Sequence, residues 1–239
     1  MTAAAISGAR GAGGPLAVAA VTTLVAAAAS RFLPDEHAAT GVGLWFLLVV
    51  YVIVLRESET SDIRAHGLAL GGVFEPEPLE ARRVGRSALT ALGWALAAAL
   101  VLLPPFWFGY VYWYRPLTDF TPAPPPSLGG DLLGQLLGVA FPEEAFYRGY
   151  LQSALDRAWP PRFRVLGAEL GPGLLVSSAI FALGHYLTVA DPARLAVFFP
   201  SLVFGYLRAR TGGIGASIAF HAACNLFASY LGRSYGLFR

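Results

Sequence analysis

Long apolar runs separated by short polar segments dominate the chain. Most of these runs approach the length of about 20 residues that a helix needs to cross the apolar core of a bilayer. The pattern predicts an all-α, polytopic transmembrane bundle of about seven spans, within a range of about six to eight. The expected spans cover residues 15–33, 41–55, 87–110, 131–159, 170–190, 193–209 and 213–231.

The polar segments divide the chain into three parts. Residues 56–86 carry five arginines and the proline-containing sequence FEPEP, so we expect a loop with one surface helix. Residues 121–130 read TPAPPPSLGG, a connector that cannot continue a helix. We therefore expect N-terminal spans and a polar loop in 1–130, a helical core in 131–231 and a tail in 232–239.

Several local features refine these spans. The first apolar run has the length of a signal peptide, but only Arg10 precedes it, which favours an uncleaved span. Pro104 and Pro105 should kink or end the third span, next to an aromatic belt at its end. His37 and His66 fall in expected loops and need no functional explanation.

Composition supports a membrane protein and excludes other classes. The chain of 239 residues is 56% hydrophobic and 13% charged, whereas soluble domains carry about 25% charged residues. Its 17 basic residues are all arginine, and they are scattered rather than gathered in a stripe, which argues against nucleic acid as a partner. The single cysteine, Cys224, excludes an internal disulfide and is expected to be a small buried side chain. Arginine placement favours a cytoplasmic N-terminus, and the alanine-rich, lysine-free composition favours a bacterial inner membrane.

Ionisable residues interrupt the span at 131–159. Each costs at least about 2.5–3.5 kcal/mol to insert, so a functional site is the default explanation. Glu144 and Arg148 are four residues apart and should pair on one helix face. Glu143 lies about 100° round the helix from Glu144, so it can face a cavity instead. Pro142 indicates that a helix, or a new turn of one, begins here, which would place both carboxylates near a positive helix end.

Two later spans carry further polar pairs at helical spacing. Phe181 and His185 share a face in FALGH, and His221 and Asn225 share a face in HAACN. Three helices can therefore direct carboxylates, an arginine, imidazoles and an amide to one point. Taken singly, these residues also fit a structural ion pair, a helix-end histidine and an amide that joins two helices.

This set of side chains suits hydrolysis. A buried glutamate beside a histidine can activate water as a general base, and a histidine with an asparagine can bind an oxyanion. Two histidines and a glutamate could also bind zinc. A proton relay in a transporter or membrane scaffold is the alternative from another class, although no two-fold repeat is visible.

The ordered motifs E-E-x-x-x-R, F-x-x-x-H and H-x-x-x-N resemble the CPBP family of intramembrane proteases, named for CAAX proteases and bacteriocin-processing enzymes. The segment ARTGGIGASIAFH before the last motif is also similar, and the resemblance covers residues 131–231. It implies a glutamic intramembrane endopeptidase without a metal cofactor. Its substrates would be membrane-associated proteins or peptides, for example C-terminal tails of the kind that myxosortases trim.

The resemblance also implies a role for each motif residue. Glu143 would activate water with the help of His185, while His221 and Asn225 would form the oxyanion hole. The residues expected to support this site are Glu144, Arg148 and Phe181.

Overall fold

The computed structural model describes residues 11–56 and 58–237, and it confirms the all-α fold. The N-terminal helices are α2 (Gly13–Phe32), α3 (Asp35–Val50) with its π-helical extension η1 (Tyr51–Leu55), α4 (Thr60–Ala65), the short η2 (Leu70–Gly72) and α5 (Ala81–Tyr114). The C-terminal helices are α6 (Leu128–Leu133), η3 (Gly134–Ala140), α7 (Phe141–Glu144), η4 (Ala145–Gln152), α8 (Ser153–Ala158), α9 (Pro172–Val189), η5 (Pro192–Val197), α10 (Phe198–Thr211) and α11 (Gly215–Ser234). A small antiparallel hairpin of β1 (Phe163–Val165) and β2 (Ala168–Leu170) precedes α9.

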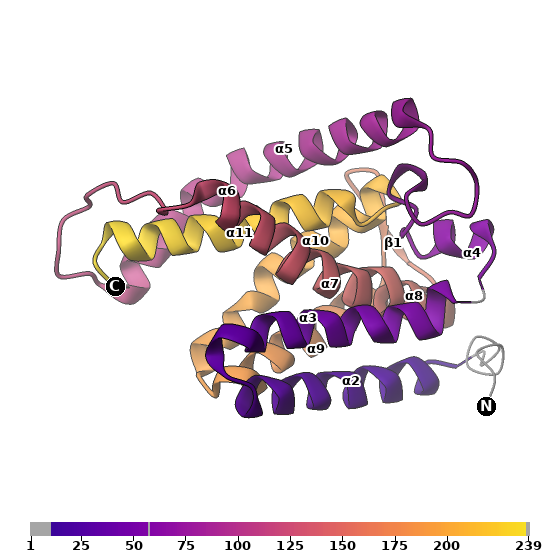
Figure 1. Cartoon of the computed structure of the whole chain (residues 1–239), viewed down its shortest axis with the longest axis horizontal. Coiled ribbons are helices and arrows are strands. Elements are labelled where there is room, and N and C mark those ends of the chain that lie inside the picture. The colour runs from indigo at the N-terminus through magenta and orange to yellow at the C-terminus, as the bar shows by residue number, and fades with distance from the viewer. Residues whose placement is uncertain (1–10, 57, 238–239) are drawn as a thin grey trace.

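The helices form a bundle in which distant parts of the sequence lie side by side. Helices α2 and α3 run next to each other along one edge, and α5 packs along α11 at the opposite edge (Figure 1). The segments from α6 to α8, together with α9 and α10, lie between these edges. The N-terminal helices thereby cover the segment that carries the acidic motif.

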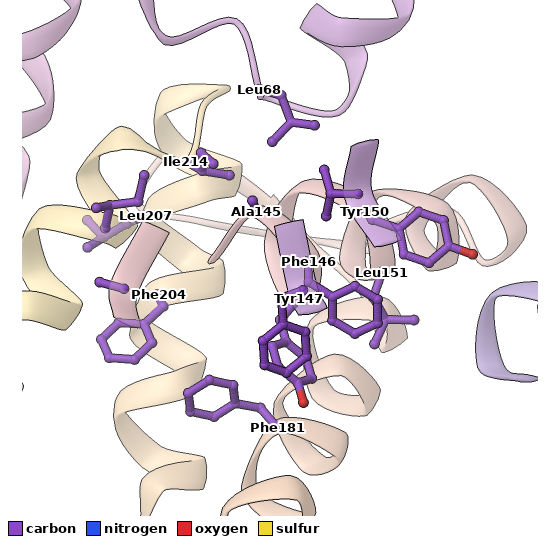
Figure 2. Close-up of a cluster of buried hydrophobic side chains, with 14 of the residues drawn as sticks. Leu68, Ala145, Phe146, Tyr147, Tyr150, Leu151, Phe181, Phe204, Leu207 and Ile214 are labelled. Atoms are coloured by element: carbon purple, nitrogen blue, oxygen red, sulfur yellow. The ribbon is translucent and has the colours of Figure 1, made fainter. Parts of the chain in front are cut away.

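An aromatic cluster fills the centre of the bundle. Phe146 and Tyr147 lie beside each other with Phe181 close to the Tyr147 ring, and Phe204 approaches from α10 (Figure 2). The Tyr147 and Phe181 rings meet edge to face at 5.0 Å, a favoured geometry for aromatic pairs. This cluster holds together the helices that carry the candidate site.

Four of the described helices are long and apolar enough to cross a membrane: α2, α3 with η1, α5 and α9. The other three expected spans, at 131–159, 193–209 and 213–231, also form helices, but these helices do not meet both the length and the apolar character that a membrane crossing needs. Helix α10 has 14 residues, which corresponds to about 21 Å against an apolar core of about 30 Å.

The structure excludes one alternative of each expectation about proline. Pro104 and Pro105 do not end the third span, because α5 continues through both of them to Tyr114. Pro142 does not begin a separate helix, because helical structure is continuous from Leu128 to Ala158, but the new α-helical turn α7 begins beside it at Phe141. The π-helical segments η3 and η4 flank the short turn that contains Pro142, and such segments are frequent at functional sites. The two carboxylates therefore lie in the middle of a long helix and not at a positive helix end.

The polar loop at 56–86 contains the expected short helix, α4, and is fastened by a buried carboxylate. Glu75 accepts hydrogen bonds of 2.7 Å from both Arg64 and Arg83. His66 follows α4, and its Nδ1 hydrogen-bonds to the Asp62 carbonyl.

Two smaller expectations need correction. His37 does not lie in a loop, because α3 already begins at Asp35. Helix α11 runs to Ser234, so the expected start of a tail at 232 falls inside a helix.

Candidate active site

A buried ion pair forms the base of the site. Arg148 Nη1 donates to Glu144 Oε1 at 3.0 Å, and both side chains are fully buried. Arg148 Nη2 also donates to the carbonyl and the hydroxyl of Ser201 on α10, at 3.1 and 2.5 Å. The guanidinium lies over the Phe181 ring at 4.5 Å, where a cation is favoured electrostatically. The arginine is thus held by a second helix as well as by its own.

His221 joins this pair from α11. Its Nδ1 lies 2.9 Å from Glu144 Oε1, and its Nε2 lies 3.8 Å from Glu143 Oε2. An ionised carboxylate only accepts hydrogen bonds, so Nδ1–H is the donor to Glu144. The imidazole also stacks on Phe204 at 4.6 Å with an interplanar angle of 13°. These contacts fix the ring so that Nε2 points toward Glu143.

Glu143 is the carboxylate that faces a cavity. Its side chain keeps 14% of its surface exposed. The cavity, of about 60 Å³, is lined by Glu143 and His185 together with residues of α2 and α3. Among the described residues no group donates a hydrogen bond to Glu143 Oε2. The two glutamates therefore have different surroundings, as their 100° separation on the helix predicts.

His185 lines the same cavity from α9. Its Nδ1 lies 3.0 Å from the Phe181 carbonyl one turn earlier, and a carbonyl accepts, so Nδ1 carries the proton there. The two rings are 4.4 Å apart. This hydrogen bond leaves Nε2 as the free nitrogen of His185.

Asn225 lies one turn after His221 and contacts a different part of the long helix. Its Nδ2 donates to Gln135 Oε1 at 2.8 Å. Gln135 precedes Glu143 by eight residues, which is about 12 Å along a helix. The structure thus brings Glu143, Glu144, Arg148, Phe181, His185 and His221 into one set of contacts, with Asn225 held at its edge by Gln135.

Sequence reasoning missed two polar partners. Ser201 binds Arg148, and Gln135 binds Asn225. Gln135 is an isolated amide in an apolar run, which is the kind of signal that marked the other residues. Ser201 gave no such signal, since serine is common in membrane helices.

A zinc site would need three donor side chains grouped around one point. Among residues 11–56 and 58–237, no three His, Cys, Asp or Glu side chains are grouped so that they could hold a metal ion. The His221 nitrogens are directed at the two glutamates, and His185 Nδ1 is bonded to a backbone carbonyl.

Fold and site together define a helical membrane protein with a charged polar centre buried inside its bundle. Residues 125–227 match the family model described as Type II CAAX prenyl endopeptidase Rce1-like. This match to a CAAX protease family agrees with the resemblance drawn from the motifs and covers most of the same residues. No curated protein and no solved structure matches the chain.

Proposed function

We propose that the chain is a glutamic intramembrane endopeptidase in which Glu143 activates the water that attacks a peptide bond. The observation that carries this proposal is the contrast between the two adjacent carboxylates. Glu144 is committed to Arg148 and His221, whereas Glu143 lines a cavity and keeps no ion pair with the arginine. A general base must be free to take a proton from a bound water, and Glu143 is the carboxylate with that freedom.

His185 assists at the same cavity. With Nδ1–H bonded to the Phe181 carbonyl, its Nε2 can accept a hydrogen bond from the attacking water or pass a proton on to the leaving amine. The ring contact with Phe181 restricts the imidazole to this orientation. Phe181 therefore acts on the chemistry by positioning His185.

His221 and Asn225 stabilise the oxyanion. The Nδ1–H of His221 is bonded to Glu144, so a role in the oxyanion hole requires a second proton on Nε2. An imidazolium keeps Nδ1–H on Glu144 and offers Nε2–H to the substrate. The Asn225 amide uses one N–H for Gln135, and its second N–H remains for the oxyanion.

The substrate class follows from the setting. A site inside a bundle of membrane-length helices is reached by membrane-associated proteins or peptides, and trimming of a C-terminal tail is one reaction of this class. The proposal places the enzyme in a bacterial inner membrane with its N-terminus in the cytoplasm. It requires no metal cofactor.

The test compares cells that carry the wild-type gene, the Glu143→Gln variant and the matched control Glu169→Gln, whose side chain is exposed on β2. Peptide termini of membrane and secreted proteins are mapped in each strain. Substrates should be cut by wild type and control and stay intact with Glu143→Gln. If Glu143→Gln restores wild-type processing to a strain that lacks the gene, the assignment of the base is wrong. If deletion changes no terminus but alters proton-coupled transport, the transporter alternative is the better description.

A further inference from the structure

Two adjoining cavities meet at Glu143. The inner one, of about 60 Å³, lies beside His185 and Thr23. The outer one, of about 180 Å³, extends toward the turn between α2 and α3 and reaches Ser30. Val42, Glu143 and Thr188 line both cavities, so the two spaces adjoin at these side chains.

The lining of this passage suits water. Hydroxyl groups from Thr23, Ser30 and Thr188 mark its course between the turn and the site, and each keeps an acceptor position beyond the one hydrogen bond it makes within the protein. A water molecule needs about 10–15 Å³ when volume is measured for water-sized probes, so the inner cavity has room for about four. Such a space is too small for a bulky substrate side chain.

The outer cavity ends where charged residues mark the membrane surface. Ser30 and Ala38 line it at the end of α2 and in the first turns of α3. The neighbouring side chains of Arg31, Asp35 and Glu36 are exposed. Arg31 Nη2 donates to the Leu187 carbonyl at 2.9 Å, which joins this turn to the end of α9. Charged side chains at helix ends sit at the interface with water, so the passage opens to an aqueous phase there.

We propose that this passage between the α2–α3 hairpin and the end of α9 is the water route to Glu143. Val42 lines both cavities next to the carboxylate, so a larger side chain at this position should obstruct the route. The role of the delivered water rests on the proposed function, but the route itself can be tested without any proteolysis.

The test uses cysteine accessibility in the full-length chain, in membrane vesicles of both orientations and in a Cys224→Ala background. A charged, membrane-impermeant thiol reagent should modify Thr188→Cys and Ala38→Cys from one side of the membrane. Leu183→Cys is the matched control, since Leu183 lies on the same helix α9 as Thr188 with 47% of its surface exposed, and an exposed leucine on a membrane-spanning helix would face lipid. Thr188→Cys should react at least about tenfold faster than Leu183→Cys, because the thiolate is the reacting form and apolar surroundings disfavour it.

A second variant tests whether a larger side chain at Val42 obstructs the route. Val42→Phe should slow the labelling of Thr23→Cys, which lies beyond Val42, and leave Ala38→Cys unchanged. Equal labelling rates for Thr188→Cys and Leu183→Cys would overturn the route. So would a Thr23→Cys labelling rate that Val42→Phe leaves unchanged. If labelling is as expected but protein termini are the same with Glu143→Gln as with wild type, the proposed proteolysis is contradicted and the route still stands.

Discussion

Glu144 Oε1 and His221 Nδ1 form a 2.9 Å hydrogen bond between residues that are 77 positions apart in the chain. The same carboxylate oxygen accepts from Arg148 at 3.0 Å. Glu144 therefore orients the imidazole and balances the arginine at once. A carboxylate that orients a histidine is a recurrent arrangement in hydrolases, and here it leaves the neighbouring Glu143 for a different task.

Removal of the Glu144 carboxylate should destabilise the protein. Glu144→Ala leaves the buried Arg148 without its counter-charge, and breaking a buried pair in this way costs about 3–5 kcal/mol. The measurement is reversible unfolding in detergent. Glu169→Ala on the surface should change stability by no more than about 0.5 kcal/mol. Equal stability of the two variants would show that the buried pair contributes nothing to the fold.

Glu143→Gln should behave in the opposite way. Glu143 makes no ion pair with Arg148, so the neutral amide should leave stability close to that of wild type. Cleavage of an identified substrate should fall by about 10²–10⁴-fold, the usual contribution of a general base. Unfolding and single-turnover cleavage are measured on the same preparation. A large loss of stability with retained cleavage would reverse the roles assigned to the two glutamates.

The Gln135–Asn225 hydrogen bond should matter for catalysis more than for binding. Asn225→Ala should lower kcat by about 10²–10³-fold, the cost of losing one oxyanion donor. Gln135→Leu removes the acceptor that orients Asn225 and should lower kcat less, with KM nearly unchanged. Gln135→Glu keeps an acceptor and should restore much of the rate. If Gln135→Glu is as slow as Gln135→Leu, the acceptor does not act by positioning Asn225.

Activity should persist in a strong zinc chelator, since the proposed glutamate mechanism uses no metal ion. The purified enzyme is dialysed against the chelator, and cleavage is measured before and after zinc is added back. Cleavage that disappears in the chelator and returns with zinc would establish the zinc-dependent alternative.

The polar loop should be sensitive to acid. The hydrogen bonds from Arg64 and Arg83 lower the pKa of Glu75 to about 2. Since this pKa is lower in the folded state, the stabilisation is complete above the ordinary carboxyl pKa of about 4.3 and is lost as the pH falls toward about 2. Limited proteolysis of residues 56–86 over this range measures the effect. Glu75→Gln should make the loop susceptible at neutral pH and remove the acid transition, and an unchanged transition would assign it to another group.

The sequence by itself determined the membrane class, the helical fold and the identity of most of the polar residues at the site. Apolar runs of membrane length have few other stable structures, because a chain in lipid must satisfy its backbone hydrogen bonds internally. Charged side chains in such runs are costly, so Glu143, Glu144 and Arg148 stand out by residue type and position alone. The spacing of Glu144 and Arg148 also determined their pairing, because side chains four residues apart share a helix face.

Only the tertiary structure decided which groups meet across helices. Helical periodicity gives the face of a residue but not the height at which two helices cross, so the partners of His221 and Asn225 could not be derived. The continuity of the long helix through Pro142 could not be derived either. The π-helical turns on both sides accommodate a residue that usually starts or breaks a helix. The passage to Glu143 was equally invisible, because Val42, Thr188 and Glu143 come from three helices and their shared cavity exists only where those helices pack.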